Sequence, residues 1–105
     1  MANTKQEEPM EVLVAYDVAT DTPEGCRRLR RVAKTCEAFG QRVQKSVFEC
    51  IVNPVELEQL MHRLRLQIDV TQDSLRVYRL REPREQYLQV IGRKPAFDLH
   101  DPLIL

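Results

Sequence analysis

The sequence has 105 residues, enough for one small domain and too few for two. Its composition, 43% hydrophobic and 30% charged, is that of an ordinary globular protein, and no apolar run approaches the length of a membrane-spanning helix. The formal net charge is zero, but residues 1–24 carry one Lys and six acids whereas residues 27–45 carry seven Lys and Arg and one Glu, and charge segregated in this way can bind polyanions.

The first nine residues are polar and end in Pro9, so residues 1–9 are expected to form a flexible extension before a single domain over residues 10–105. Glu11–Tyr16 (EVLVAY) is nearly continuous in apolar residues, which predicts a central strand buried on both faces. Asp17 closes this strand.

A first helix is indicated after residue 21. Thr22 suits the N-cap and Pro23 suits the first helical position. One apolar stripe recurs at helical spacing and consists of Cys26, Leu29, Val32, Ala33, Cys36 and Phe39. Gly40 is expected to cap the C-terminus of this helix.

Arg42–Val52 alternates polar and apolar residues but is long for one strand. We therefore expect a bend near Lys45–Ser46, either within one long strand or between two short ones. Asn53–Glu56 is a second helix start, with Asn as cap, Pro at the first position and Glu three residues after the cap. Its apolar stripe consists of Leu57, Leu60, Met61, Leu64 and Ile68.

The last part of the sequence predicts a polar turn at Asp69–Asp73 and a strand at Ser74–Leu80. Leu88–Ile91 is expected to be a further short strand ended by Gly92, and Leu103–Leu105 to be a strand-like apolar tail. The order β-α-β-(β)-α-β predicts an α+β protein with the ferredoxin-like split arrangement. Its antiparallel sheet would have four to five strands, with two helices on one face and a second copy of the chain on the other.

Asp17 is the first candidate for chemistry because it stands where the chain leaves a buried strand. Mg²⁺ in proteins is held by one or two carboxylates together with water and phosphate oxygens. Two copies of Asp17 brought together by a two-fold axis would therefore make a better site than one. The alternative is that Asp17 ends the strand and accepts hydrogen bonds from the next turn.

A basic helix face is the second candidate. A guanidinium can bind a phosphate through two hydrogen bonds, and each neutralised phosphate releases counterions. The candidate phosphate contacts are Arg27, Arg28, Arg30, Arg31 and Lys34, with Arg42 and Lys45 beyond the helix. The alternative is a solvated helix face whose cations pair with acids elsewhere in the chain.

Three residues near these candidates allow two interpretations each. Tyr16 and Phe48 could stack on a base or pack in the core, and core packing is favoured for Phe48. Ser46 could contact a phosphate or be an ordinary strand hydroxyl.

The three cysteines match no metal or disulfide spacing. We expect Cys26, Cys36 and Cys50 to be small buried hydrophobes in a reduced, cytoplasmic protein. The sequence also contains no P-loop, no GxGxxG, no nucleophile elbow, no zinc cluster and no aromatic signature of an RNA-recognition motif. These absences disfavour most of the familiar enzyme classes.

Five segments follow one another in a characteristic order with compatible gaps. They are residues 14–18 (VAYDV), 28–34 (RLRRVAK), 39–50 (FGQRVQKSVFEC), the pair 68–69 and 73–78 (ID, DSLRVY), and 103–105 (LIL). Together they resemble the small CRISPR-associated endonuclease family of the spacer-acquisition complex, and the likeness spans about residues 10–105.

The resemblance implies a symmetric homodimer that joins CRISPR integrase subunits, binds double-stranded DNA and helps to insert foreign fragments as new spacers. It also implies a metal-dependent endonuclease acting on single-stranded RNA or double-stranded DNA. Asp17 stands at the family's metal-binding aspartate, where Mg²⁺ or Mn²⁺ would activate a water. Arg31 and Arg42 fall at family positions linked to nucleic-acid contact or activity, as do Tyr16, Ser46 and Phe48.

Two functions stay open at this point: an endonuclease that depends on Asp17, and a non-catalytic adaptor that binds DNA and bridges integrase subunits without cutting. The net charge of +6 over residues 27–45, from seven cations and one acid, disfavours a small-molecule regulatory domain of the same fold. The Leu103–Leu105 tail is expected to add a strand to the partner subunit or to the integrase, or to pack on its own sheet edge.

Overall fold

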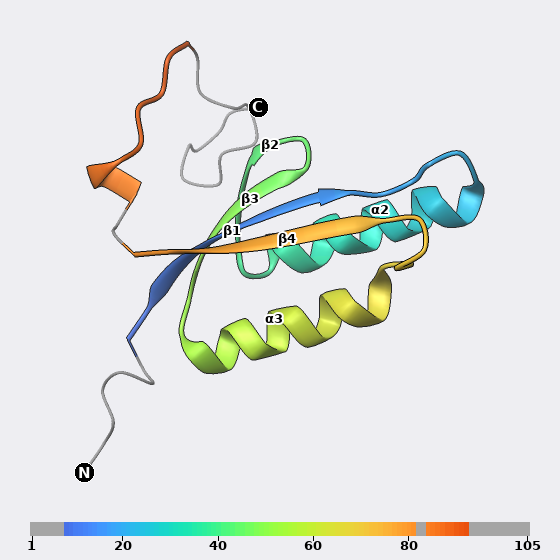
Figure 1. Ribbon diagram of the computed structural model, residues 1–105, viewed down its shortest axis with the longest axis horizontal. Helices are drawn as coiled ribbons and strands as arrows, with labels where there is room; N and C mark the ends of the chain where they lie inside the picture. The colour runs from blue at the N-terminus through green and yellow to red at the C-terminus, as the bar shows by residue number, and fades with distance from the viewer. Residues whose placement is uncertain (1–7, 82–83, 93–105) are drawn as a thin grey trace.

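The computed structural model describes residues 8–81 and 84–92 (Figure 1). Their elements follow the order β-α-β-β-α-β: β1 (Met10–Asp17), α2 (Pro23–Glu37), β2 (Gly40–Gln44), β3 (Val47–Val52), α3 (Pro54–Gln67) and β4 (Ser74–Leu80), followed by a 3-10 turn, η1 (Arg84–Gln86). All strand pairs are antiparallel, and the order across the sheet is β2-β3-β1-β4. The predicted α+β fold with the split arrangement is confirmed.

Both helices cover the same face of the sheet (Figure 1), and the core lies between them and that face. Side chains alternate across a strand, so every second residue of β1 and β3 points toward the helices. The core residues are Val12, Val14, Tyr16, Val18, Val32, Cys36, Phe48, Cys50, Val52, Leu57, Leu60 and Leu64. Burial of each large apolar side chain stabilises the fold by about 1.5–3 kcal/mol.

The opposite face of the sheet has no helix over it in the described part of the chain. On this open face β1 presents Leu13 and Ala15, both half-buried, while Ile51 of β3 and Tyr78 of β4 are 55% and 43% exposed. The predicted central position of the first strand is confirmed. Its predicted burial on both faces is not found among these residues, because the helices cover only one face.

The starts of both helices are as predicted. The Thr22 hydroxyl accepts a hydrogen bond from the Gly25 N–H at 3.0 Å at the start of α2. At the start of α3, Asn53 and Glu56 each accept from the other's backbone N–H at 2.8 Å, which completes a capping box.

Gly40 does not cap α2, contrary to the sequence-based expectation. The helix ends at Glu37 with Ala38 as its C-cap, and Gly40 opens β2 opposite Cys50. A Cβ at residue 40 would lie 2.2 Å from the carbonyl oxygen of Glu49 and 2.6 Å from the Cα of Cys50. The glycine is therefore required by the close approach of β3, and the helix end does not need it.

Lys45–Ser46 is a turn between two short strands, which settles the choice left open for that segment.

The expected strand at Leu88–Ile91 is wrong: these residues have no regular secondary structure and are exposed. A strand needs a neighbour to take its backbone hydrogen bonds, and residues 88–91 pair with neither edge strand of the described sheet, β2 or β4. Residues 1–7 of the expected extension and the Leu103–Leu105 tail lie outside the described residues.

Neither described helix is long and apolar enough to cross a membrane.

Candidate functional site

Asp17 is the last residue of β1, and its side chain is exposed. Because Tyr16 points into the core, Asp17 points to the open face of the sheet, and it is paired with Ser74 of β4. The Tyr16 N–H donates to the carbonyl of Ser46 at 3.0 Å, so the β2–β3 turn lies beside Asp17. The carboxylate thus lies at the end of a central strand, on the face of the sheet on which a second copy of the chain was expected.

Asp17 fits one half of a divalent cation site. Among the described residues, no three His, Cys, Asp or Glu side chains gather where they could hold a metal ion. Mg²⁺ takes oxygen ligands and often only one or two carboxylates, keeping waters and phosphate oxygens for the rest. An exposed carboxylate on the open face therefore suits Mg²⁺ or Mn²⁺, provided that a second chain or a nucleic-acid phosphate supplies further ligands.

Tyr16 and Phe48 pack in the core beside Asp17. Their rings stack with centroids 6.2 Å apart, and both residues are buried. Burial raises the pKa of Tyr16, although the positive charge of Arg42 acts in the opposite direction, so the phenol stays protonated. Both rings therefore pack in the core, the interpretation favoured for Phe48, and contact of these two residues with nucleic acid stays a prediction.

Arg42 is held at the edge of this aromatic pair. Its guanidinium carbon lies 5.1 Å from the centroid of the Phe48 ring, and its Nη2 lies 3.6 Å from a carboxylate oxygen of Glu37. The side chain is partly exposed, so a fixed cation reaches from the core toward the surface. Contact of Arg42 with nucleic acid stays a prediction.

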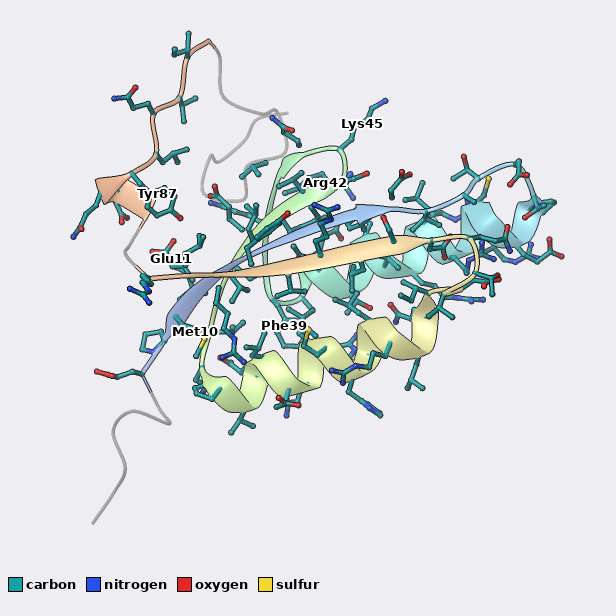
Figure 2. The ribbon with its side chains drawn as sticks, in the orientation of Figure 1. Met10, Glu11, Phe39, Arg42, Lys45 and Tyr87 are labelled. Atoms are coloured by element: carbon teal, nitrogen blue, oxygen red, sulfur yellow. The ribbon has the colours of Figure 1, made fainter. Side chains whose placement is uncertain are left out.

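The β2–β3 turn places Lys45 and Ser46 at the same end of the sheet as Asp17. Besides the bond to Ser46, Tyr16 donates its hydroxyl to the carbonyl of Lys45 at 3.4 Å, so one residue of β1 anchors the turn twice. Figure 2 shows the Lys45 side chain projecting away from the sheet at the tip of the turn. The Lys45 side chain is exposed, whereas that of Arg42 is held by Glu37 and the Phe48 ring.

The exposed cations of α2 form one stripe, which we call the basic face of α2: Arg27, Arg30, Arg31 and Lys34. Residues spaced by three, four and seven positions lie on one side of a helix. Arg27 also lies 3.6 Å from Glu24, but both side chains are well exposed, and such surface pairs contribute at most about 1 kcal/mol. The stripe is therefore available for phosphates.

Arg28 does not belong to the basic face of α2. Its Nε donates to Oδ2 of Asp73 at 2.9 Å and its Nη2 donates to Oδ1 at 3.4 Å. The Arg28 side chain is only 13% exposed and that of Asp73 is fully buried. Burial raises the pKa of Asp73, but hydrogen bonds from Arg28 and from two backbone N–H groups outweigh it, so the pKa is lowered overall. We therefore remove Arg28 from the candidate phosphate contacts.

Asp73 is the residue of this region that the sequence did not single out. It stood in the sequence as one acid of a polar turn, yet it accepts hydrogen bonds from Ala19 and Arg28, residues 54 and 45 positions away. The signals in the sequence were its position directly before a strand and its place in the segment 73–78 of the family resemblance.

Cys36 and Cys50 are buried, as expected for small hydrophobes. Burial raises the pKa of the Cys36 thiol to about 12 and that of Cys50 to about 11, so both stay protonated and unreactive at neutral pH. Cys26 is only partly buried, and its thiol lies 3.5 Å from the carbonyl of Thr20. The thiols thus form no part of the site at Asp17.

Comparison with known proteins gives one consistent family. A family model described as CRISPR associated protein Cas2 matches residues 10–87. CRISPR-associated endoribonuclease Cas2 1 of Moorella thermoacetica is 55% identical over 96 residues, covering 91% of this chain and 100% of the relative. CRISPR-associated endonuclease Cas2 of Halalkalibacterium halodurans is 52% identical and covers 90% of this chain and 99% of its own. The crystal structure of Streptococcus pyogenes Cas2 at pH 6.5 superposes with a TM-score of 0.72 at 51% identity, covering 79% of this chain and 100% of that chain.

Proposed function

Because the chain belongs to the Cas2 family of CRISPR-associated endonucleases, we propose that it cleaves phosphodiester bonds with a divalent cation held by Asp17. The observation that carries this proposal is the position of Asp17: an exposed carboxylate at the end of a buried strand, on the open face of the sheet. Two copies related by a two-fold axis would bring two such carboxylates together at one site.

Mg²⁺ or Mn²⁺ bound there would supply Lewis-acid stabilisation of the scissile phosphate and a more acidic water. The residues of the chain would bind the phosphates of the substrate. Lys45 projects from the turn that Tyr16 anchors beside Asp17, so it can hold a substrate phosphate near the carboxylate. The basic face of α2 would bind further phosphates along the strand, and Arg42 reaches the surface from its fixed position on Phe48.

The proposed substrate is a nucleic acid that the protein recognises by its phosphate backbone. One relative is named an endoribonuclease and another an endonuclease, and the phosphodiester bond is what DNA and RNA share. None of the exposed candidates is aromatic, so base stacking contributes little to recognition by these residues. We therefore propose cleavage that depends more on backbone charge than on sequence.

The same proposal includes a homodimer that binds double-stranded DNA and bridges integrase subunits during spacer acquisition. The exposed Ile51 and Tyr78 on the open face supply an apolar surface for a second copy. An adaptor that binds DNA without cutting is the second candidate. It is favoured by one observation: the exposed cations of the basic face of α2 can bind phosphates without a metal ion.

Cleavage assays separate the two candidates. Wild type, Asp17→Ala and the control Asp21→Ala, which removes another exposed acid, are incubated with double-stranded DNA and single-stranded RNA in Mg²⁺, Mn²⁺ or EDTA. We expect cleavage by wild type and Asp21→Ala with metal, and none by Asp17→Ala or in EDTA. Binding without cleavage by all three proteins would leave the adaptor, and equal cleavage by all three would exclude Asp17 from the reaction.

A further inference from the structure

The carboxylate of Asp73 joins the β1–α2 loop, α2 and the α3–β4 turn. Oδ1 accepts from the Ala19 N–H in the β1–α2 loop at 3.0 Å and from Nη2 of Arg28 in α2 at 3.4 Å. Oδ2 accepts from the Asp69 N–H in the α3–β4 turn at 2.8 Å and from Nε of Arg28 at 2.9 Å. Asp73 itself directly precedes β4. A fully buried carboxylate with four donors is thus a fixed point of the fold.

Asp73 is linked to the backbone around Asp17 in two ways. The strand partner of Asp17 is Ser74, the residue next to Asp73, and Ala19 is two residues beyond Asp17. Between them, Val18 is buried. The backbone at Asp17 is therefore held by the β1–β4 ladder before it and by the Asp73 carboxylate after it.

Arg28 extends the same fixed point to α2. It lies between Arg27 and Arg30 of the basic face, but its own side chain turns inward to Asp73. The helix that presents the phosphate-binding cations and the loop that leaves Asp17 consequently share one anchor. A change at that anchor would alter the distance between them.

We propose that Asp73, held by Arg28, is a positioning residue that sets the place of the Asp17 carboxylate relative to the basic face of α2. This inference rests on the proposed nuclease function. The Asp73 side chain is fully buried and acts through the Ala19 backbone and Arg28. Displacement of a reacting group by about 1 Å can reduce turnover about 100-fold, so the anchor has a measurable effect on catalysis.

Asp73→Asn tests the anchor with little change in volume. An amide has one acceptor oxygen and one NH₂ group. The NH₂ group would therefore replace one carboxylate oxygen and could not accept the hydrogen bonds that this oxygen receives. Arg28→Ala removes the partner, and Arg28→Lys keeps the charge with a weaker bond. Asn53→Ala is the matched control, because it breaks the capping box of α3 at the opposite end of β1, where Val52 pairs with Met10.

Each variant is measured for its unfolding midpoint, for kcat and KM of Mn²⁺-dependent cleavage, and for hydrogen exchange at the Ala19 amide. In Asp73→Asn we expect kcat to fall about tenfold or more with KM within about threefold, and Ala19 exchange to quicken about tenfold or more. Arg28→Lys should keep more of kcat than Arg28→Ala does. Asn53→Ala should lower the unfolding midpoint while leaving kcat and Ala19 exchange unchanged.

Wild-type kcat in folded Asp73→Asn, or the same loss of kcat in Asn53→Ala, would overturn the inference. If Asp73→Asn does not fold, the comparison of Arg28→Lys with Arg28→Ala decides: equal kcat in the two contradicts positioning. If the wild type cuts nothing, the proposed function fails, and Ala19 exchange in Asp73→Asn or Arg28→Ala alone decides whether the anchor orders the backbone that leaves Asp17.

Discussion

At the scale of single residues, two carboxylates of the α3–β4 turn link stability to pH. Hydrogen bonds from the hydroxyl and N–H of Thr71, and then from Gln72, lower the pKa of Asp69 to about 2. The pKa of Asp73 is also lowered, because its donors outweigh its burial. A carboxyl whose pKa is lower in the folded chain contributes stability above its unfolded pKa and loses it as the pH falls through the folded pKa.

Stability should therefore be constant near neutral pH and fall as the pH drops below the unfolded value of 3.8. Asp73→Asn should be less stable at pH 7 by about 1–3 kcal/mol, since buried donors lose their acceptor, and should lose less on acidification. Urea unfolding of both proteins between pH 2 and pH 7 measures this. The same acid dependence in both would assign it to other groups.

Thiol reactivity follows burial in the same way. Cys26 is partly exposed, whereas burial raises the pKa of Cys36 and Cys50 to about 12 and about 11. Iodoacetamide at pH 8 should modify Cys26 and leave the other two until the chain unfolds. Mass spectrometry of the native and urea-unfolded protein checks this, and early modification of Cys36 or Cys50 would mean that the core opens locally.

At the scale of elements, the basic face of α2 should carry the phosphate contacts. Removing one contact lowers the slope of log K against log salt by about 0.9 for duplex DNA. Arg31→Ala should therefore weaken binding and flatten the slope, whereas Arg65→Ala, an exposed arginine of α3, should change neither. Fluorescence titrations at several salt concentrations measure both, and equal effects of the two variants would show that binding is not localised on α2.

The elements also show which features a sequence can predict. Both helix starts were predicted correctly because their signals, Thr22–Pro23 and Asn53–Glu56, act within one turn of the chain. Gly40 was misassigned because its requirement comes from backbone atoms of β3. The pairing of Arg28 with Asp73 was missed for the same reason, since 45 residues separate them.

At the scale of the whole molecule, the open face should form the dimer. Ile51→Lys would put a charge on that face and remove apolar area, so we expect dimerisation to weaken about tenfold or more. Val55→Lys is the matched control, because Val55 on α3 is 61% exposed and Ile51 is 55% exposed. Sedimentation equilibrium measures both, and a dimer that withstands Ile51→Lys would contradict this use of the face.

The environment of the site residues depends on how the helices and strands pack together more than on any local sequence pattern. Asp17 became a candidate because it ends a hydrophobic strand and stands at the metal-binding position of the family that the sequence resembles; it is exposed, and its role as a metal ligand stays a prediction. Core packing was favoured from the sequence for Phe48 but not for Tyr16, since only the packing of the helices on the sheet decides that both rings are buried. In the proposed cation site a second chain would supply further ligands, and no pattern within one chain specifies how two copies come together.

Mn²⁺ binding tests most directly whether two Asp17 carboxylates form one cation site. Electron paramagnetic resonance counts bound Mn²⁺ as it is titrated into wild type and into Asp17→Asn, which keeps the shape of the side chain and loses its charge. Wild type should bind about one ion per two chains, and Asp17→Asn should bind none at the same concentrations. Equal binding by the two proteins would contradict a cation site at Asp17.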